Sequence, residues 1–108
     1  MDVQEDPHMD AVALPITGIV SDPKIRSGRP IIEGTTLRVM DVAALYKYQA
    51  RTPEQIAEDY RLSMPQVYAA LAYYFANQAE IDTDFERESR LILEARDKSV
   101  GRSDSSLS

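Results

Sequence analysis

Thr52 to Leu71 reads TPEQIAEDYRLSMPQVYAAL, and this stretch of the chain decides the fold. Two helix starts are visible in it. Thr52 and Ser63 are each followed by a proline within two residues and by a glutamine three residues later, which is a capping-box pattern. Two helix starts so close together predict one short helix, a tight turn and a second helix.

Apolar residues in this stretch fall where a helix-turn-helix requires them. Ala57 is small where the two helices would cross, Leu62 fills the turn, and Val67 faces the core. The other positions that fit are Ile56, Tyr60 and Leu71. The pattern predicts a helix-turn-helix, and a helical hairpin that only packs is the alternative. Residue 61 is arginine where this motif usually has glycine, which predicts a less tight turn.

Extended and helical segments flank the motif. Ile16–Val20 and Arg29–Glu33 are short stretches beside turn residues and predict two strands. Val39–Ala50 has helical apolar spacing, and the helix that Ser63 begins should end near Gln78. Two short strands alone are marginal in water, so they must dock on helices or pair with a second subunit. We therefore expect a homodimer.

The predicted organisation is a mainly α, helix-turn-helix bundle with a short N-terminal two-stranded β element. Residues 1–14 are acidic and residues 99–108 are serine-rich, so both are predicted to be flexible tails. The β element and the helix-turn-helix domain should occupy residues 15–81, and a C-terminal helix residues 82–98. The net charge of −6 counts against a purely electrostatic nucleic-acid binder. Ile16–Arg61 carries seven bases against six acids, so a mild basic face is expected only there.

The composition argues against catalysis. Cysteine is absent and the single histidine is His8, in the predicted N-terminal tail, so the usual nucleophile–base pairs and sulfur-ligated metals are excluded. We expect no enzyme activity, no catalytic residues, no metal and no cofactor. No window approaches the roughly 20 apolar residues of a membrane span, and the N-terminus is acidic where a signal peptide is basic. We expect a cytoplasmic protein that does not enter the membrane.

The third helix would be the recognition helix of the motif. Its core face is predicted to use Val67, Leu71, Tyr74 and Phe75, leaving Pro65, Gln66, Ala69, Ala70 and Tyr73 outward. This outward face has a glutamine for adenine but no arginine or lysine for guanine. The predicted DNA-binding residues are therefore mostly phosphate contacts: Lys24, Arg26, Arg29, Arg38 and Arg51, with Gln66 and Tyr73 toward the groove. Alternatively, the Lys24–Arg29 loop is a solvated turn, and the face with Tyr68 and Tyr73 binds a protein.

The C-terminal helix is the predicted partner-binding element. Its apolar residues Phe85, Leu91, Ile92 and Leu93 are spread around the helix, so one protomer's core cannot cover them all, and Phe85, Leu91 and Ile92 are the predicted partner contacts. Acids gather near its start, at Asp82, Asp84, Glu86 and Glu88. They either stabilise and solubilise the helix or approach a basic partner.

The run from Ile16 to Asp82 resembles the bacterial family known as domain of unknown function 433. The motifs that carry the resemblance are Asp22-Pro23-Lys24-Ile25, Gly28-Arg29-Pro30-Ile31-Ile32-Glu33-Gly34-Thr35, Val39-Met40-Asp41-Val42, Thr52-Pro53-Glu54-Gln55-Ile56 and Ala69-Ala70-Leu71-Ala72-Tyr73-Tyr74. The resemblance implies a homeodomain-like helix-turn-helix fold and a role as the antitoxin-like partner of a PIN-like nuclease toxin. Thr36 stands where the family usually has arginine, and Arg38 is nearby.

Together with this resemblance, the sequence predicts an autoregulating antitoxin, in which a homodimer binds operator DNA while the C-terminal segment neutralises a nuclease toxin. One alternative is a helix-turn-helix transcriptional regulator without a toxin. Another is a structural dimerisation or protein-interaction module whose helix-turn-helix does not bind DNA, which the excess of acids and the alanine-lined third helix favour.

Overall fold

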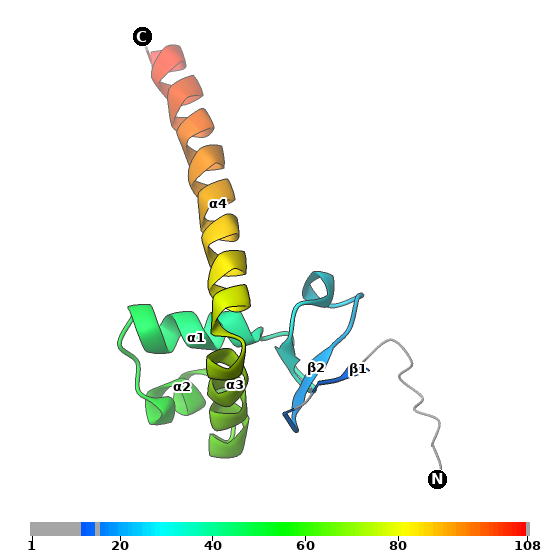
Figure 1. The fold of residues 1–108 in the computed structure, drawn as a ribbon. Coiled ribbons are helices and arrows are strands. Elements are labelled where there is room, and N and C mark those ends of the chain that lie inside the picture. Colours follow the sequence, from blue (N-terminus) through cyan, green and yellow to red (C-terminus); the bar gives the residue numbers. More distant parts are fainter. Residues whose placement is uncertain (1–11, 15, 108) are drawn as a thin grey trace. The chain divides into compact units, whose positions relative to one another are not determined.

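The computed structural model describes the backbone of residues 12–14 and 16–107, and the side chains of residues 14 and 16–98. Contacts divide the chain into two compact units, one ending at Asn77 and one beginning at Gln78. The first unit holds three short strands, a 3-10 turn and three helices, and the second is a single helix (Figure 1). The fold is mainly helical with a short antiparallel sheet near the N-terminus, as the sequence predicted.

The strands form one antiparallel sheet in the order β1-β2-β3. The two predicted strands appear as β2 (Ile19–Ser21) and β3 (Ile31–Ile32), paired with Ile19 opposite Ile32. A third strand, β1 (Val12–Ala13), pairs with the other edge of β2. It lies inside the range 1–14 that was predicted as a tail, and residues 1–11 of that range lie outside the described residues.

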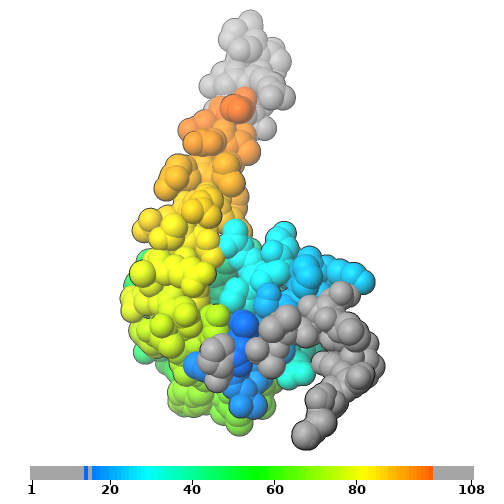
Figure 2. Space-filling model, turned by 45° about the vertical axis from the view of Figure 1, so that its right-hand side comes forward, coloured from blue at the N-terminus to red at the C-terminus, as the bar shows by residue number. Residues whose placement is uncertain are grey.

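The helices of the first unit are α1 (Val39–Tyr48), α2 (Pro53–Tyr60) and α3 (Met64–Ala76). α3 contacts α1, α2 and both β2 and β3. The fully buried side chains come from all of these elements: Ile19, Ile31, Ile32, Val39, Val42, Ile56, Val67 and Tyr74. Figure 2 shows the same relationship at the surface, where the blue and cyan β element lies directly against the green helices. The strands therefore gain stability by docking on the helices.

The two capping boxes form as the sequence predicted. The Thr52 hydroxyl accepts a hydrogen bond from the Gln55 N–H at 3.1 Å, and the Gln55 side chain accepts one from the Thr52 N–H at 2.9 Å. The Ser63 hydroxyl accepts from the Gln66 N–H at 3.2 Å, and the Gln66 side chain accepts from the Ser63 N–H at 2.7 Å. These reciprocal bonds satisfy main-chain donors that a helix start leaves unpaired.

The turn between α2 and α3 is tight, and the prediction of a looser turn was wrong. Arg61 adopts the left-handed conformation at φ 57° and ψ 46°, although it is not glycine. The Leu62 N–H donates to the Ala57 carbonyl at 2.9 Å, which closes the end of α2. A single non-glycine residue in this region costs about 1 kcal/mol or more, which the packing of α2 on α3 offsets.

Helix α4 (Gln78–Leu107) begins earlier and ends later than the predicted range 82–98. Near the predicted start, the Thr83 hydroxyl donates a hydrogen bond to the Ala79 carbonyl at 2.9 Å, which places Thr83 more than one turn inside the helix. The described helix also continues through most of the range 99–108 that was predicted as a tail. No proline follows Pro65 in the sequence, so no residue there obliges the helix to stop.

Candidate binding surfaces

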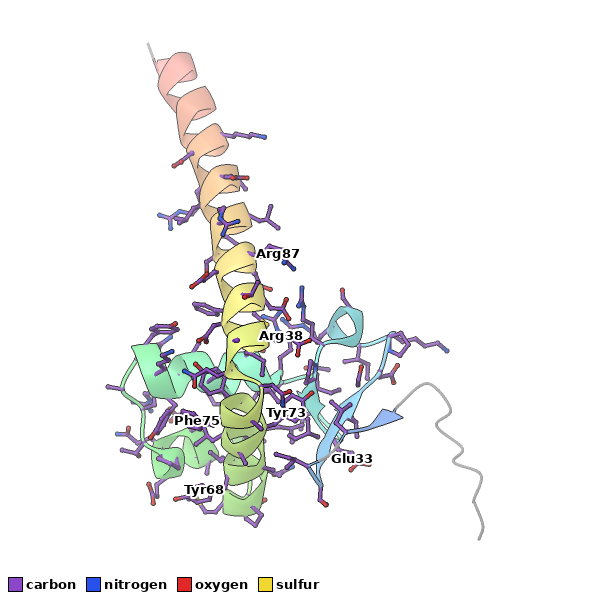
Figure 3. The ribbon with its side chains drawn as sticks, viewed as in Figure 1. Glu33, Arg38, Tyr68, Tyr73, Phe75 and Arg87 are labelled. Atoms are coloured by element: carbon purple, nitrogen blue, oxygen red, sulfur yellow. The ribbon has the colours of Figure 1, made fainter. Side chains whose placement is uncertain are left out.

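Helix α3 turns a different face to the core than the sequence predicted. Val67, Leu71 and Tyr74 are buried as expected. Phe75 was expected in the core and is 54% exposed, whereas Ala70 and Tyr73 were expected outward and are 0% and 9% exposed. Figure 3 shows Phe75 and Tyr73 on opposite sides of the α3 ribbon.

The sheet is the reason for this difference. β2 and β3 contact α3, and a Cβ atom added to Gly18, next to β2, would lie 4.0 Å from the Cβ of Ala69. The backbone at Gly18 therefore approaches the side of α3 that was predicted to enter a DNA groove. Tyr73 is not available as a groove contact, and the prediction that it faces outward was wrong.

The side of α3 that does face outward is apolar. It consists of Pro65, Tyr68, Ala72, Phe75 and Ala76, and we call this set the outer face of α3. Tyr68 is 51% exposed. Tyr46 of α1 extends the surface, because its ring meets that of Phe75 edge to face with centroids 6.3 Å apart. Neither Tyr46 nor Phe75 was predicted as a surface residue of a binding site, although the spacing of residues 65, 68, 72, 75 and 76 marks one side of a helix.

Arg38 is not a free cation at the surface. It is 8% exposed, and its guanidinium binds Asp41 through Nε to Oδ2 at 3.1 Å and Nη2 to Oδ1 at 2.8 Å. The main-chain N–H of Arg38 also donates to Asp41 Oδ2 at 3.0 Å, so the pair caps the start of α1. The predicted phosphate contact at Arg38 does not agree with this burial.

Two further predicted DNA contacts are engaged within the fold. Arg51 forms an ion pair with Asp59 of α2. The side-chain oxygen of Gln66 is occupied by the Ser63 N–H, which leaves its amide group as a donor. None of the bonds described above joins Arg51, Gln66 or Tyr73 to one another or to the Lys24–Arg29 loop.

The Lys24–Arg29 loop is the predicted DNA-binding segment that remains at the surface. The Arg26 side chain is 41% exposed, donates to the Thr36 carbonyl at 3.2 Å, and lies 3.8 Å from Asp41 Oδ2. Arg26 and Arg38 therefore share one carboxylate. The loop is held by hydrogen bonds from the Lys24 N–H to Asp22 and from the Ser21 hydroxyl to the Gly28 carbonyl.

Helix α4 exposes three consecutive apolar side chains. Leu91, Ile92 and Leu93 are 60%, 52% and 55% exposed, and Phe85, the other predicted partner contact, is half-buried. Successive helical residues differ by about 100° in direction, so these three side chains span roughly 200° of the circumference. No single flat surface can cover them.

Among the described residues, no three His, Cys, Asp or Glu side chains stand close enough together to hold a metal ion. A half-open cavity of about 920 Å³ lies over the β element, with Ile16, Ile25 and Thr35 among its lining residues. None of the helices within the described part of the chain is both long and apolar enough to cross a membrane.

Comparison with known proteins agrees with the fold. No functionally curated protein is significantly similar in sequence. Among solved structures, the crystal structure of Rv2018 from Mycobacterium tuberculosis is similar at a TM-score of 0.50 and 31% sequence identity, over 57% of this chain and 30% of that chain. The chain thus matches less than a third of the length of Rv2018. The model of the family described as "Protein of unknown function (DUF433)" matches residues 19–74, from the start of β2 to Tyr74 in α3, so the chain belongs to this family.

Proposed function

We propose that this protein is an antitoxin-like binding protein of the cytoplasm that pairs with and neutralises a PIN-like nuclease, and that α4 is the element that binds it. The observation that carries the proposal is the exposed run Leu91, Ile92 and Leu93. Burying each such side chain contributes about 1.5–3 kcal/mol, and their spread around the helix requires a partner that encloses α4 in a groove.

The charge of α4 supports a basic partner. Residues 80–88 hold five acids and one base, and the base, Arg87, lies 3.5 Å from Asp84. A nuclease presents positive charge where it holds the phosphates of RNA. An acidic helix followed by an apolar run would be drawn to that surface and then held by burial. The nuclease as the partner is what the resemblance to the family implies.

Co-expression tests the proposal. The PIN-like nuclease encoded next to this chain should arrest growth when expressed alone, and co-expression of this protein should restore growth. Ile92→Asp should lose the rescue, because a carboxylate would enter the apolar groove. Arg96→Ala is the matched control on the same exposed helix and should retain it. Retained rescue by Ile92→Asp, or the lack of an adjacent nuclease gene, would contradict the proposal.

DNA binding is a second candidate function, which would let the protein regulate its own operon. It is favoured by the tight turn at Arg61 between α2 and α3 and by the exposed Lys24 and Arg26 in their hydrogen-bonded loop. The opposing feature is the surface of α2, where Glu54, Glu58 and Asp59 carry negative charge. DNA contact would therefore be made mainly to phosphates, and it would be weak.

A salt titration separates this candidate from the first. With operator DNA, Arg26→Ala should reduce the slope of log K against log salt by about one unit, because one phosphate contact is lost. Glu33→Ala, an exposed change elsewhere in the β element, is the control. A slope that Arg26→Ala leaves unchanged would remove the Lys24–Arg29 loop from any DNA interface without affecting the nuclease proposal.

A further inference from the structure

The outer face of α3 is apolar and remains exposed within the first unit. Its five residues fall within roughly 100° of the helix circumference, the width that a surface helix normally turns toward a core. None of the thirteen residues of α3 is charged, and its opposite side is already buried. A helix that is apolar all round is normally buried on every side. Tyr46 adds a further aromatic ring beside Phe75.

We propose that a second copy of this chain covers the outer face, with the two α3 helices packed antiparallel about a two-fold axis at Ala72. This inference does not depend on the nuclease or on DNA. It assigns the expected homodimer to a helix face, whereas the sequence had suggested strand pairing between subunits.

The distribution of charge favours a second copy as the partner. The sequence from Val12 to Asn77 holds seven bases and six acids, a net charge of +1. Because the whole chain has a net charge of −6, the remaining residues together have a net charge of −7. The segment from Val12 to Asn77, which holds the outer face, therefore adds little charge repulsion between two copies. A basic partner would be attracted to the acidic α4, whereas the outer face, with no charge of its own, offers it no electrostatic attraction.

The order of large and small residues makes the outer face complementary to itself. With the axis at Ala72, residue 68 of one helix lies opposite residue 76 of the other, because the two positions are equally distant from 72. Tyr68 then packs over Ala76, and Ala72 packs against Ala72. Small side chains at the axis permit close approach of the helices, and aromatic side chains beside them supply buried area. A two-fold interface requires such self-complementarity.

The oligomeric state and a designed crosslink test the proposal. The full chain should have twice its monomer mass of 12.1 kDa in sedimentation at micromolar concentration. Tyr68→Glu should raise the dimer Kd roughly tenfold or more, because it places a charge in the apolar interface. Tyr48→Glu is the control, since Tyr48 is equally exposed at 56% and lies about 200° around α1 from Tyr46.

The absence of native cysteine makes crosslinking specific. Ala72→Cys should form a disulfide-linked dimer on oxidation, and Glu33→Cys, an exposed position in the β element, should not. The crosslink also decides the matter if Tyr68→Glu does not fold. A monomeric mass for the unaltered chain would overturn the proposal. So would a dimer that Ala72→Cys does not crosslink. A monomer whose Tyr68→Glu variant loses nuclease binding would assign the face to the nuclease instead.

Discussion

The Nζ of Lys47 donates a hydrogen bond to the phenol oxygen of Tyr74 at 3.0 Å, and this bond joins α1 to α3. Tyr74 is 1% exposed, so its hydroxyl lies within the packed unit. The lysine also stands 5.7 Å from the centre of the same ring. The lysine side chain thus makes both a hydrogen bond to the hydroxyl and a cation–π contact with the ring of the same buried tyrosine.

A double-mutant cycle should detect this bond. Lys47→Met and Tyr74→Phe each remove one partner, and the coupling between them should be about 0.5–1.5 kcal/mol in the free energy of unfolding measured with urea. Lys47→Met combined with Val67→Ala is the reference pair, because the valine side chain has no atom that can form a hydrogen bond with lysine. Additive effects of Lys47→Met and Tyr74→Phe would contradict the expected coupling.

Arg61→Gly should stabilise the protein by about 1 kcal/mol, because glycine adopts the left-handed conformation at φ 57° without strain. Arg61 is exposed, so little packing is lost. Arg61→Ala separates the backbone effect from the loss of the side chain, since alanine keeps the Cβ and should give no gain. A midpoint of urea unfolding that does not rise in Arg61→Gly would show that the turn is not strained.

Ser63→Ala should destabilise the protein by about 1 kcal/mol, because the hydroxyl that accepts the Gln66 N–H is lost at the start of α3. Ser63→Asp retains an acceptor and should restore most of the stability. Thermal unfolding followed by circular dichroism measures both. Equal stability of Ser63→Ala and the unaltered chain would mean that water replaces the cap at no cost.

Ile56→Ala should lower the free energy of unfolding by about 2–5 kcal/mol, since the side chain is 0% exposed and truncation leaves a cavity. Tyr68→Ala removes a larger side chain from a position that is 51% exposed, and in the separated monomer it should cost far less. Urea unfolding at protein concentrations below the dimer Kd compares the two. If Tyr68→Ala lowers the free energy of unfolding more than Ile56→Ala does, the assignment of Ile56 to the core and of Tyr68 to the surface is wrong.

The local features of the fold could be predicted from the sequence because they depend on neighbours in the chain. A serine or threonine three residues before a glutamine specifies its own reciprocal hydrogen bonds, and both boxes formed. The two strands around Ile19 and Ile31 were also predicted, although the short partner strand β1 was assigned to a tail. The predicted range 82–98 lies within helix α4, but both ends of the helix were missed, because the sequence has no strong capping signal at its start and no strong stop signal at its end.

The orientation of α3 was decided only by the tertiary structure. Apolar residues surround this helix, so its periodicity does not distinguish the side that meets α1 and α2 from the side that meets the sheet or solvent. The approach of Gly18 to Ala69 buries one such side and thereby leaves Tyr68 and Phe75 at the surface. Arg38 and Asp41 stand three residues apart, so their pairing is local, but the burial of Arg38 to 8% exposure depends on the elements packed around it. Which groups a folded chain buries depends on residues distant in sequence, and those contacts exist only once the elements have packed.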